Sequence, residues 1–572
     1  MLDLVIKGGS VIDGTGAPAK RADVGVRDGR IVEIGDINEK ASTTLDAEGR
    51  VVTPGFVDLH THYDPQVMWD PAATPSSLHG VTSIFGGNCG FSIAPITPAA
   101  ADYLLPMLAR VEGMPVEALE AGLDLAWDGF GSWLGRLDGK LAVNAGFMVG
   151  HSALRRVVMG EDAIGHEASP QQLEAMVALL HESIAAGGIG FSSTASGSHS
   201  DHLGNPVPSR FATREEFLAL AKAAGEHAGT SLEFIAAAAA IFTDDEIALM
   251  ADMSAIAKRS LNWNVMVVSA DESMRAGREN KLSASDVAAE RGGHVVGLLL
   301  PEPMRMRLCF AAGFVLDMLP GIKDFIHLPH PERLAAFADP NVRAQIAQAL
   351  PPGQTSNMLM NFADYTVVDV QNSELQRYVG MRISAIAAEQ NKDAMTAMFD
   401  LIVADDLQTG FEPLAIGTDD ASWEERVRLL ETEPRVIAGG SDAGAHLDMM
   451  KTFACHTSFM AETVRKRQLI SLERAVRLFT DVPARFYGLK DRGRVQTGWI
   501  ADLVIMDPEK IGPGTITPRA DLPGGGWRLY SEATGVEATI VNGTPIVLGG
   551  KVTGATPGTA LRSGRDTETV AI

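Results

Sequence analysis

Hydrophobic and polar positions follow a strand-like spacing near both ends of the chain. Close to the N-terminus, β-branched runs such as LVIKGGSVID and ADVGVRDGRIVEIGD are interrupted by Gly, Asp and Asn. The same pattern returns in ADLVIMD (501–507) and ATIVNGTPIVLGGKVTG (538–554). Such runs between turn residues predict strands and hairpins, and Asn542-Gly543 is a two-residue hairpin signal.

Between these ends, helical and strand-like patterns alternate. Helical spacing occurs in PQQLEAMVALLHESIAAG (170–187) and REEFLALAKAAGEHAG (214–229), and short apolar runs occur in GIGFSST (188–194), SLEFIA (231–236), NVMVVSA (264–270) and RVIAGGSD (435–442). Alternation of this kind over roughly 430 residues predicts parallel βαβ units. That length accommodates a (β/α)8 barrel of about 250 residues together with insertions.

These patterns predict an α/β protein in two parts. We expect a (β/α)8, TIM-like barrel over residues 58–490, with insertions near 96–140 and 275–420. We expect the segments 1–57 and 491–572 to form a small β-sandwich domain together, because both have the same strand pattern. The chain of 572 residues is long enough to bury a large core.

Composition and charge narrow the class of partner. Hydrophobic residues make up 46% of the chain and charged residues 21%, and the net charge is −24 without a basic stripe. Nucleic acid and anionic membranes are therefore poor partners, because both require clustered Lys and Arg. Three scattered cysteines favour a reducing compartment, and neither a signal peptide nor a membrane-length apolar run is apparent. We expect a cytoplasmic protein that acts on a small molecule and leave open whether it forms a homo-oligomer.

Candidate chemistry starts in VVTPGFVDLHTH (51–62), where an apolar run ends in His60 and His62. Side chains two apart on a strand point the same way, and the carboxyl end of a barrel strand is where barrel active sites are built. Imidazole is a good ligand for Zn²⁺. An isolated HxH is more often a buried, hydrogen-bonded pair, but Pro-Gly and Asp58 before it make this string more specific for a metal site.

Two later strand ends add reactive groups. Cys89 stands in GNCG (87–90), where it is either a thiolate ligand or a small buried hydrophobe. Asp442 stands among glycines in IAGGSDAGAH (437–446). It could bind a metal and accept a proton from water, or it could cap the next helix. His446 could line the same pocket.

Together with MVGHSALR (148–155) and GFSSTAS (190–196), these strings resemble the N-acyl-D-amino-acid deacylase (D-aminoacylase-like) branch of the amidohydrolase superfamily, and in particular a large subgroup of it. The resemblance covers nearly the whole chain. It implies a metal-bearing barrel with a small β-domain, and hydrolysis of N-acyl (D-) amino acids or related amides by water activated by a metal. It also implies roles for particular residues: His60, His62 and Cys89 as metal ligands, Asp442 as general base and then general acid, and His151 as the histidine of the GHxxLR string.

The chain departs from the family pattern at two predicted strands. The family places ligand histidines on strands five and six, whereas this sequence has Glu233 near the first position and Asn262 or Asn264 near the second. A carboxylate and an amide in place of two imidazoles argue against the usual two-metal site. Glu233 could instead be structural or bind substrate. We expect one Zn²⁺, held by members of this set: His60, His62, Cys89, Glu233 and Asp442.

The family's substrate-binding lysine is also absent from the strand-six string. Arg155 or an arginine of the second insertion could bind a substrate carboxylate, because a guanidinium pairs with it bidentately. The other candidate substrate-binding residues are His151, Asn264 and His446, and the loop histidines His199 and His202 are either further contacts or ordinary loop residues. Two alternatives stay open: a cyclic amide or lactone hydrolase on the same barrel, and a non-catalytic binding or assembly protein.

Overall fold

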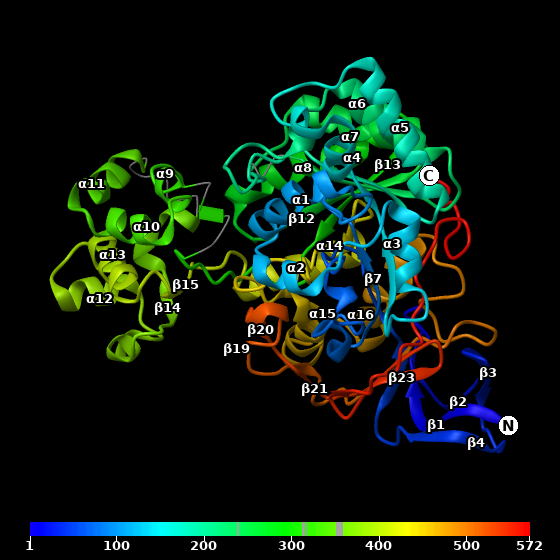
Figure 1. Ribbon diagram of the computed structural model, residues 1–572. Coiled ribbons are helices and arrows are strands. Elements are labelled where there is room, and N and C mark those ends of the chain that lie inside the picture. The colour runs from blue at the N-terminus through cyan, green and yellow to red at the C-terminus, as the bar shows by residue number, and fades with distance from the viewer. Residues whose placement is uncertain (237–239, 312–314, 317–318, 351–357) are drawn as a thin grey trace.

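The computed structural model describes residues 1–236, 240–311, 315–316, 319–350 and 358–572 (Figure 1). Strands from both chain ends share one nine-stranded sheet, in the order β24-β23-β22-β17-β5-β1-β2-β3 with β4 beside β1. Its strands are β1 (Leu2–Val11), β2 (Lys20–Arg27), β3 (Arg30–Gly35), β4 (Ala41–Asp46), β5 (Val51–Pro54), β17 (Leu503–Met506), β22 (Val536–Val541), β23 (Thr544–Leu548) and β24 (Lys551–Val552). Antiparallel pairing of β5 with β17 joins the two halves. The sandwich arrangement of this part stays a prediction.

The centre of the molecule is built from parallel strands in two sheets, β6-β7-β8 and β9-β10-β11-β12-β13-β16. They are β6 (Phe56–Asp58), β7 (Val81–Gly86), β8 (Asn144–Phe147), β9 (Val149–Gly150), β10 (Gly190–Thr194), β11 (Ser231–Ile235), β12 (Ser260–Met266), β13 (His294–Leu299) and β16 (Val436–Ala438). Only Met148 separates β8 from β9. At the other end of the series, Thr61 forms a parallel bridge with Ala443, and the amide of His62 donates to the Ala443 carbonyl at 2.8 Å.

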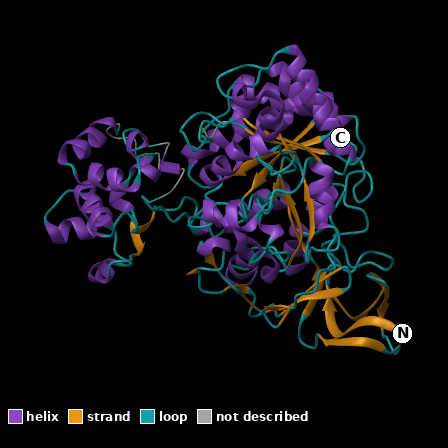
Figure 2. Ribbon diagram, viewed as in Figure 1, coloured by secondary structure: helices purple, strands orange, loops and turns teal. Residues whose placement is uncertain are grey.

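Helices alternate with these strands, as the sequence pattern predicts. Most begin at a capping residue: Ser169 and Gln172 form a capping box on α5, and Thr243 and Glu246 form one on α7. The helices of this central part are α4 (His151–Met159), α5 (Pro170–Ala185), α6 (Arg214–Gly225), α7 (Asp244–Ala257), α8 (Glu272–Glu290), α14 (Asp420–Thr432), α15 (Cys455–Phe459), α16 (Leu472–Phe479) and α17 (Asp481–Phe486). Figure 2 shows that helices cover the outside of the parallel strands.

Two additional segments interrupt the alternation. The first carries α1 (Pro98–Val111), α2 (Val116–Gly122) and α3 (Phe130–Leu137), which pack on the central part. The second projects to the left in Figure 1 and has its own apolar cluster, which includes Phe310, Phe399 and Phe411. Its elements are α9 (Lys323–Ile326), α10 (His330–Ala338), α11 (Pro340–Ala349), β14 (Thr366–Asp369), α12 (Ile383–Gln390), α13 (Ala394–Ala404) and β15 (Gly410–Glu412).

Short strands follow the central part: β18 (Gly512–Pro513), β19 (Thr517–Arg519), β20 (Arg528–Tyr530) and β21 (Ala533–Thr534). They form two two-stranded sheets, β18-β21 and β19-β20. In the described part of the chain, no helix is both long enough and apolar enough to cross a membrane.

Candidate active site

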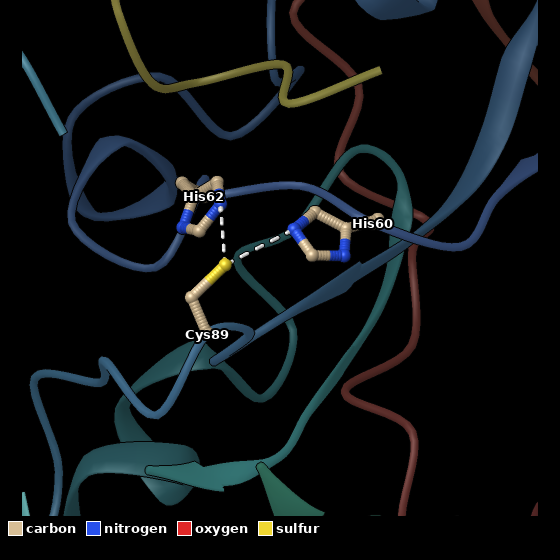
Figure 3. Close-up of side chains that lie close together, drawn as sticks. All are labelled: His60, His62 and Cys89. Carbon is tan, nitrogen blue, oxygen red and sulfur yellow. Dashed lines mark hydrogen bonds between the residues drawn. The ribbon is translucent and has the colours of Figure 1, made fainter. Parts of the chain in front are cut away.

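The structure brings His60, His62 and Cys89 together at the ends of β6 and β7 (Figure 3). The Cys89 Sγ lies 3.4 Å from His60 Nε2 and 3.9 Å from His62 Nε2. All three side chains are buried, and their candidate ligand atoms lie within 4.8 Å of one another. Two imidazole nitrogens and one thiol are a donor set that suits Zn²⁺.

A glycine turn places Cys89 in this group. Gly87 has φ +72°, and a side chain there would collide with the carbonyl oxygen of Met148. Only glycine satisfies both conditions without strain. Cys89 and Asp442 also have positive φ values, of 57° and 51°. Non-glycine residues in this region are held there by their surroundings and concentrate at functional sites.

Asp442 lies beside the three donors, in the loop after β16. Its Oδ1 is 3.2 Å from His60 Nε2 and 3.8 Å from His62 Nε2. Asn264 Nδ2 donates to the same oxygen at 3.1 Å. Burial alone would raise the pKa of Asp442, but the contacts with His60 and His62 outweigh it and hold this pKa far below its ordinary value. The carboxylate is therefore ionised at neutral pH.

Glu112 completes the polar group, although no motif in the sequence predicts it. It follows the last residue of α1, and its Oε1 lies 3.3 Å from His62 Nδ1. A proton shared with Glu112 on Nδ1 leaves the Nε2 lone pair directed to the side of Cys89. The sole signal in the sequence is a glutamate directly after the apolar helix YLLPMLARV, within the first predicted insertion.

Glu233 supports the group from β11. Its Oε2 accepts a hydrogen bond from the Cys89 amide at 2.8 Å, and its Oε1 lies 3.9 Å from His60 Nδ1. Neither His60 Nδ1 nor Glu233 Oε1 has a hydrogen-bond partner among the described residues. Glu233 does not belong to the group of three close donors, so its role as a ligand stays a prediction.

The charges of the site fit a bound cation. Burial raises the pKa of Glu233 to about 7 and that of Glu112 well above its ordinary value. Burial and the neighbouring carboxylates also raise the pKa of the Cys89 thiol. Three carboxyl groups and a thiol enclosed together are costly to ionise unless a positive charge compensates them. A divalent metal between the imidazoles and the thiol would supply that charge.

A cavity of about 290 Å³ opens onto these groups. Its polar lining includes His62, Cys89, Glu112, Ser196, Ser198, His199, Asn264, Lys281, Asp442 and His446, and its apolar lining includes Ile235, Phe242, Trp263, Val267 and Met304. Asn264, His446 and His199 therefore all line this cavity, and their contact with a substrate stays a prediction. Asn262 does not line the cavity, because its Nδ2 donates to the Leu232 carbonyl and the Tyr487 hydroxyl.

The expected substrate contacts of His151 and Arg155 require correction. Both side chains are fully buried and neither lines the cavity. His151 Nε2 lies 2.8 Å from Glu216 Oε1, and Arg155 contacts both Glu216 oxygens at 2.6 Å. Because the guanidinium is already paired with Glu216, it is not available to a substrate carboxylate. His202 does not line the cavity either and packs on the Tyr103 ring.

Comparison with known proteins gives consistent matches. Residues 43–547 match the model of the Amidohydrolase family. The chain is 29% identical to the D-aminoacylase of Alcaligenes xylosoxydans xylosoxydans over 563 residues, 95% of this chain and 94% of that protein. A crystal structure of D-aminoacylase has a TM-score of 0.65 at 24% identity, covering 98% of this chain and all (100%) of that one. N-acyl-D-glutamate deacylase from Bordetella bronchiseptica, complexed with zinc and a phosphonate inhibitor, has a TM-score of 0.62 at 24% identity over 98% and 100% of the two chains.

Proposed function

The chain belongs to the Amidohydrolase family, and on this basis we propose that it is a metal-dependent hydrolase that cleaves the amide bond of N-acyl amino acids, D-configured, or related amides. The resemblance inferred from the sequence is thereby confirmed. The observation that carries the proposal is the buried group of His60, His62 and Cys89 beside Asp442, open to a cavity. Relatives described as D-aminoacylase and N-acyl-D-glutamate deacylase support the choice of bond and of stereochemistry.

We infer the finer architecture from the same matches. The chain-ordered parallel strands, and the bridge from Thr61 back to Ala443, support a closed (β/α)8 barrel over residues 58–490. The shared terminal sheet supports a β-domain made from residues 1–57 and 491–572. The cytoplasmic location and a homo-oligomer stay predictions.

His60, His62 and Cys89 would hold the metal, one Zn²⁺, with Asp442 and Glu233 beside it. When bound, Zn²⁺ supplies Lewis acidity that makes water a better nucleophile at neutral pH and polarises the scissile carbonyl. Glu112 orients His62 through Nδ1, and Glu233 fixes the Cys89 amide. The arrangement is suited to hydrolysis because the cation site and an ionised carboxylate share one cavity.

Asp442 moves the protons of the reaction. As the water oxygen bonds to the amide carbon, one proton passes to the Asp442 carboxylate, which Asn264 holds in place. As the carbon–nitrogen bond breaks, Asp442 returns this proton to the leaving nitrogen. The products are a free carboxylic acid and a free amine, and the carboxylate is regenerated.

The test is hydrolysis by zinc-loaded protein of a panel that contains N-acetyl-D-amino acids, their L-isomers, a hydantoin and a lactone. We expect release of D-amino acids, and a loss in kcat of roughly 10²–10⁴-fold in Asp442→Asn. A matched control is Asp128→Asn, because Asp128 lies exposed on the first insertion. Near-normal activity in Asp442→Asn would refute the role of Asp442 in proton transfer. Turnover of the hydantoin or lactone alone would move the assignment to the cyclic substrates, and no turnover at all would favour the binding-protein alternative.

A further inference from the structure

A single lysine reaches the cavity from a helix of the α/β alternation. Lys281 lies on α8 and is the one Lys or Arg among the described residues that line this cavity. It shares the cavity with Cys89 and Asp442. No sequence pattern selects this lysine, because it stands in the polar stretch RENKLSASD within the second predicted insertion.

Neighbouring residues hold Lys281 in a defined position. Its ammonium lies 5.3 Å from the centre of the Phe242 ring. Asn280 receives a hydrogen bond from the Phe242 amide at 2.6 Å and returns one to the Phe242 carbonyl at 3.1 Å. The Phe242 ring meets the Trp263 ring edge-on at 5.1 Å, and Leu282, next to the lysine, is fully buried. A cation fixed over an aromatic ring beside a cavity is preorganised to bind an anion.

The ammonium is not neutralised by a direct partner. No hydrogen bond or ion pair joins Lys281 Nζ to a residue in the described part of the chain, although the charge of Glu246 acts on it from α7. The ionised carboxylate of Asp442 lines the same cavity and repels anions. Among the described residues that line the cavity, Lys281 is therefore the one Lys or Arg side chain that can pair with an entering carboxylate.

We propose that Lys281 binds the carboxylate of the substrate and that the apolar wall beside it selects N-acyl derivatives of neutral, apolar amino acids. Ile235, Phe242, Trp263, Val267 and Met304 form this wall. A second carboxylate, as in an N-acyl glutamate or aspartate, would find no further Lys or Arg among the described lining residues and would meet apolar side chains, which is unfavourable. The inference rests on the proposed function and names its substrate class.

The first test compares N-acetyl-D-leucine with N-acetyl-D-leucinamide, in which the carboxylate is neutral. Lys281→Met should raise KM for the acid roughly tenfold to hundredfold, with little change in kcat, and leave KM for the amide nearly unchanged. Lys281→Arg should restore part of the loss. Lys140→Met is the matched control, because Lys140 is exposed on the other insertion. Equal effects on acid and amide, or no effect on either, would overturn the role of Lys281.

The second test is the choice of side chain. Wild-type protein should prefer N-acetyl-D-leucine over N-acetyl-D-glutamate by roughly tenfold or more in kcat/KM. Equal or better use of the glutamate derivative would overturn the substrate class.

A binding measurement separates this inference from the proposed function. Titration calorimetry with N-acetyl-D-leucine on Asp442→Asn, with and without Lys281→Met, reports binding without turnover. Lys281-dependent binding in a protein that hydrolyses no amide would refute the hydrolase assignment and support the lysine. Hydrolysis together with binding that does not depend on Lys281 would support the hydrolase assignment and refute the role of Lys281. Absence of hydrolysis and of Lys281-dependent binding would refute the two proposals together.

Discussion

At the scale of single residues, the site depends on partners that fix each donor. His62 is the clearest case, because Glu112 contacts its Nδ1 while Cys89 and Asp442 lie on the side of Nε2. A carboxylate behind a ligand histidine sets its tautomer and its orientation. The chain takes that carboxylate from the end of α1, far from the strand that supplies the histidine.

Glu112→Gln should weaken zinc binding by roughly 10–100-fold, because an amide orients His62 less strongly through Nδ1 than a carboxyl group does. Competition with a chromogenic chelator measures the affinity. Glu117→Gln, on the exposed face of α2, is the matched control and should bind zinc like the wild type. Unchanged zinc affinity in Glu112→Gln would show that Glu112 has no role at the metal.

The pH dependence of substrate binding should follow the protonation of a single residue, Lys281. Burial lowers the pKa of Lys281 from 10.5, and Glu246 opposes the shift. The charged ammonium exists below this lowered pKa, so carboxylate binding should be lost as the pH rises through it, at lower pH than for an exposed lysine. KM for N-acetyl-D-leucine should therefore rise at alkaline pH. The amide substrate reports any titration of Glu112, Asp442 or the histidines that line the cavity, and an identical rise for both substrates would argue against Lys281.

At the scale of elements, a buried ion-pair network joins α4 to α6. Glu216 on α6 contacts His151 and Arg155 on α4. Burial alone would raise the pKa of Glu216, but the contacts with His151 and Arg155 outweigh it and lower this pKa. A carboxyl group with a lowered pKa stabilises the fold above its unfolded value, near 4.5, and this contribution is lost as the pH falls through the folded value.

Arg155→Met should lower the free energy of unfolding by about 3–5 kcal/mol, because it leaves the buried Glu216 charge without its guanidinium. Urea unfolding at pH 7 measures this loss. As the pH falls from 7 to below 4.5 and through the lowered pKa of Glu216, the wild type should lose more stability than Glu216→Gln, which has no carboxyl group to titrate. KM of folded Arg155→Met should equal that of the wild type, and a large rise in KM would restore Arg155 as a substrate contact.

At the scale of the whole molecule, the second additional segment, which carries α9 to α13, β14 and β15, packs against the loop that carries Asp442. Met449 and Met450 belong to the apolar cluster of that segment. The Arg307 amide donates to the Met449 carbonyl at 2.8 Å, and Met306 forms an antiparallel bridge with Met450. The segment therefore supports the loop that carries Asp442.

Met450→Ala should reduce kcat, because a cavity at this contact loosens the loop, and a misplacement of about 1 Å in an active site can cost roughly 10²-fold. Met398→Ala removes the same side chain from α13, in the interior of the same cluster. Each variant should lose about 2–5 kcal/mol of stability, but Met398→Ala should keep its kcat. Equal kcat values in the two variants would show that the segment does not brace the loop.

The sequence predicted those parts of the site that short local strings encode. His60, His62, Cys89 and Asp442 stand at the ends of apolar strands, and parallel strands bring their carboxyl ends together. Glu112 and Lys281 were not predicted, because they stand at the end of α1 and within α8. Only tertiary packing decides whether a charged residue on a helix faces a cavity. Arg155 was misread for a related reason: its partner, Glu216, lies 61 residues away, so nothing local reveals that the guanidinium is already paired.

His60, His62 and Cys89 should together form a metal centre. This is tested by the zinc content per chain, measured by elemental mass spectrometry after reconstitution and removal of excess metal. We predict about one Zn²⁺ per wild-type chain and loss of it in His60→Ala and Cys89→Ala, because each variant removes one of the three close donors. Glu233→Ala, measured beside them, decides whether that carboxylate is a ligand. No zinc in the wild type, or full zinc content in Cys89→Ala, would show that these three residues do not form a metal centre.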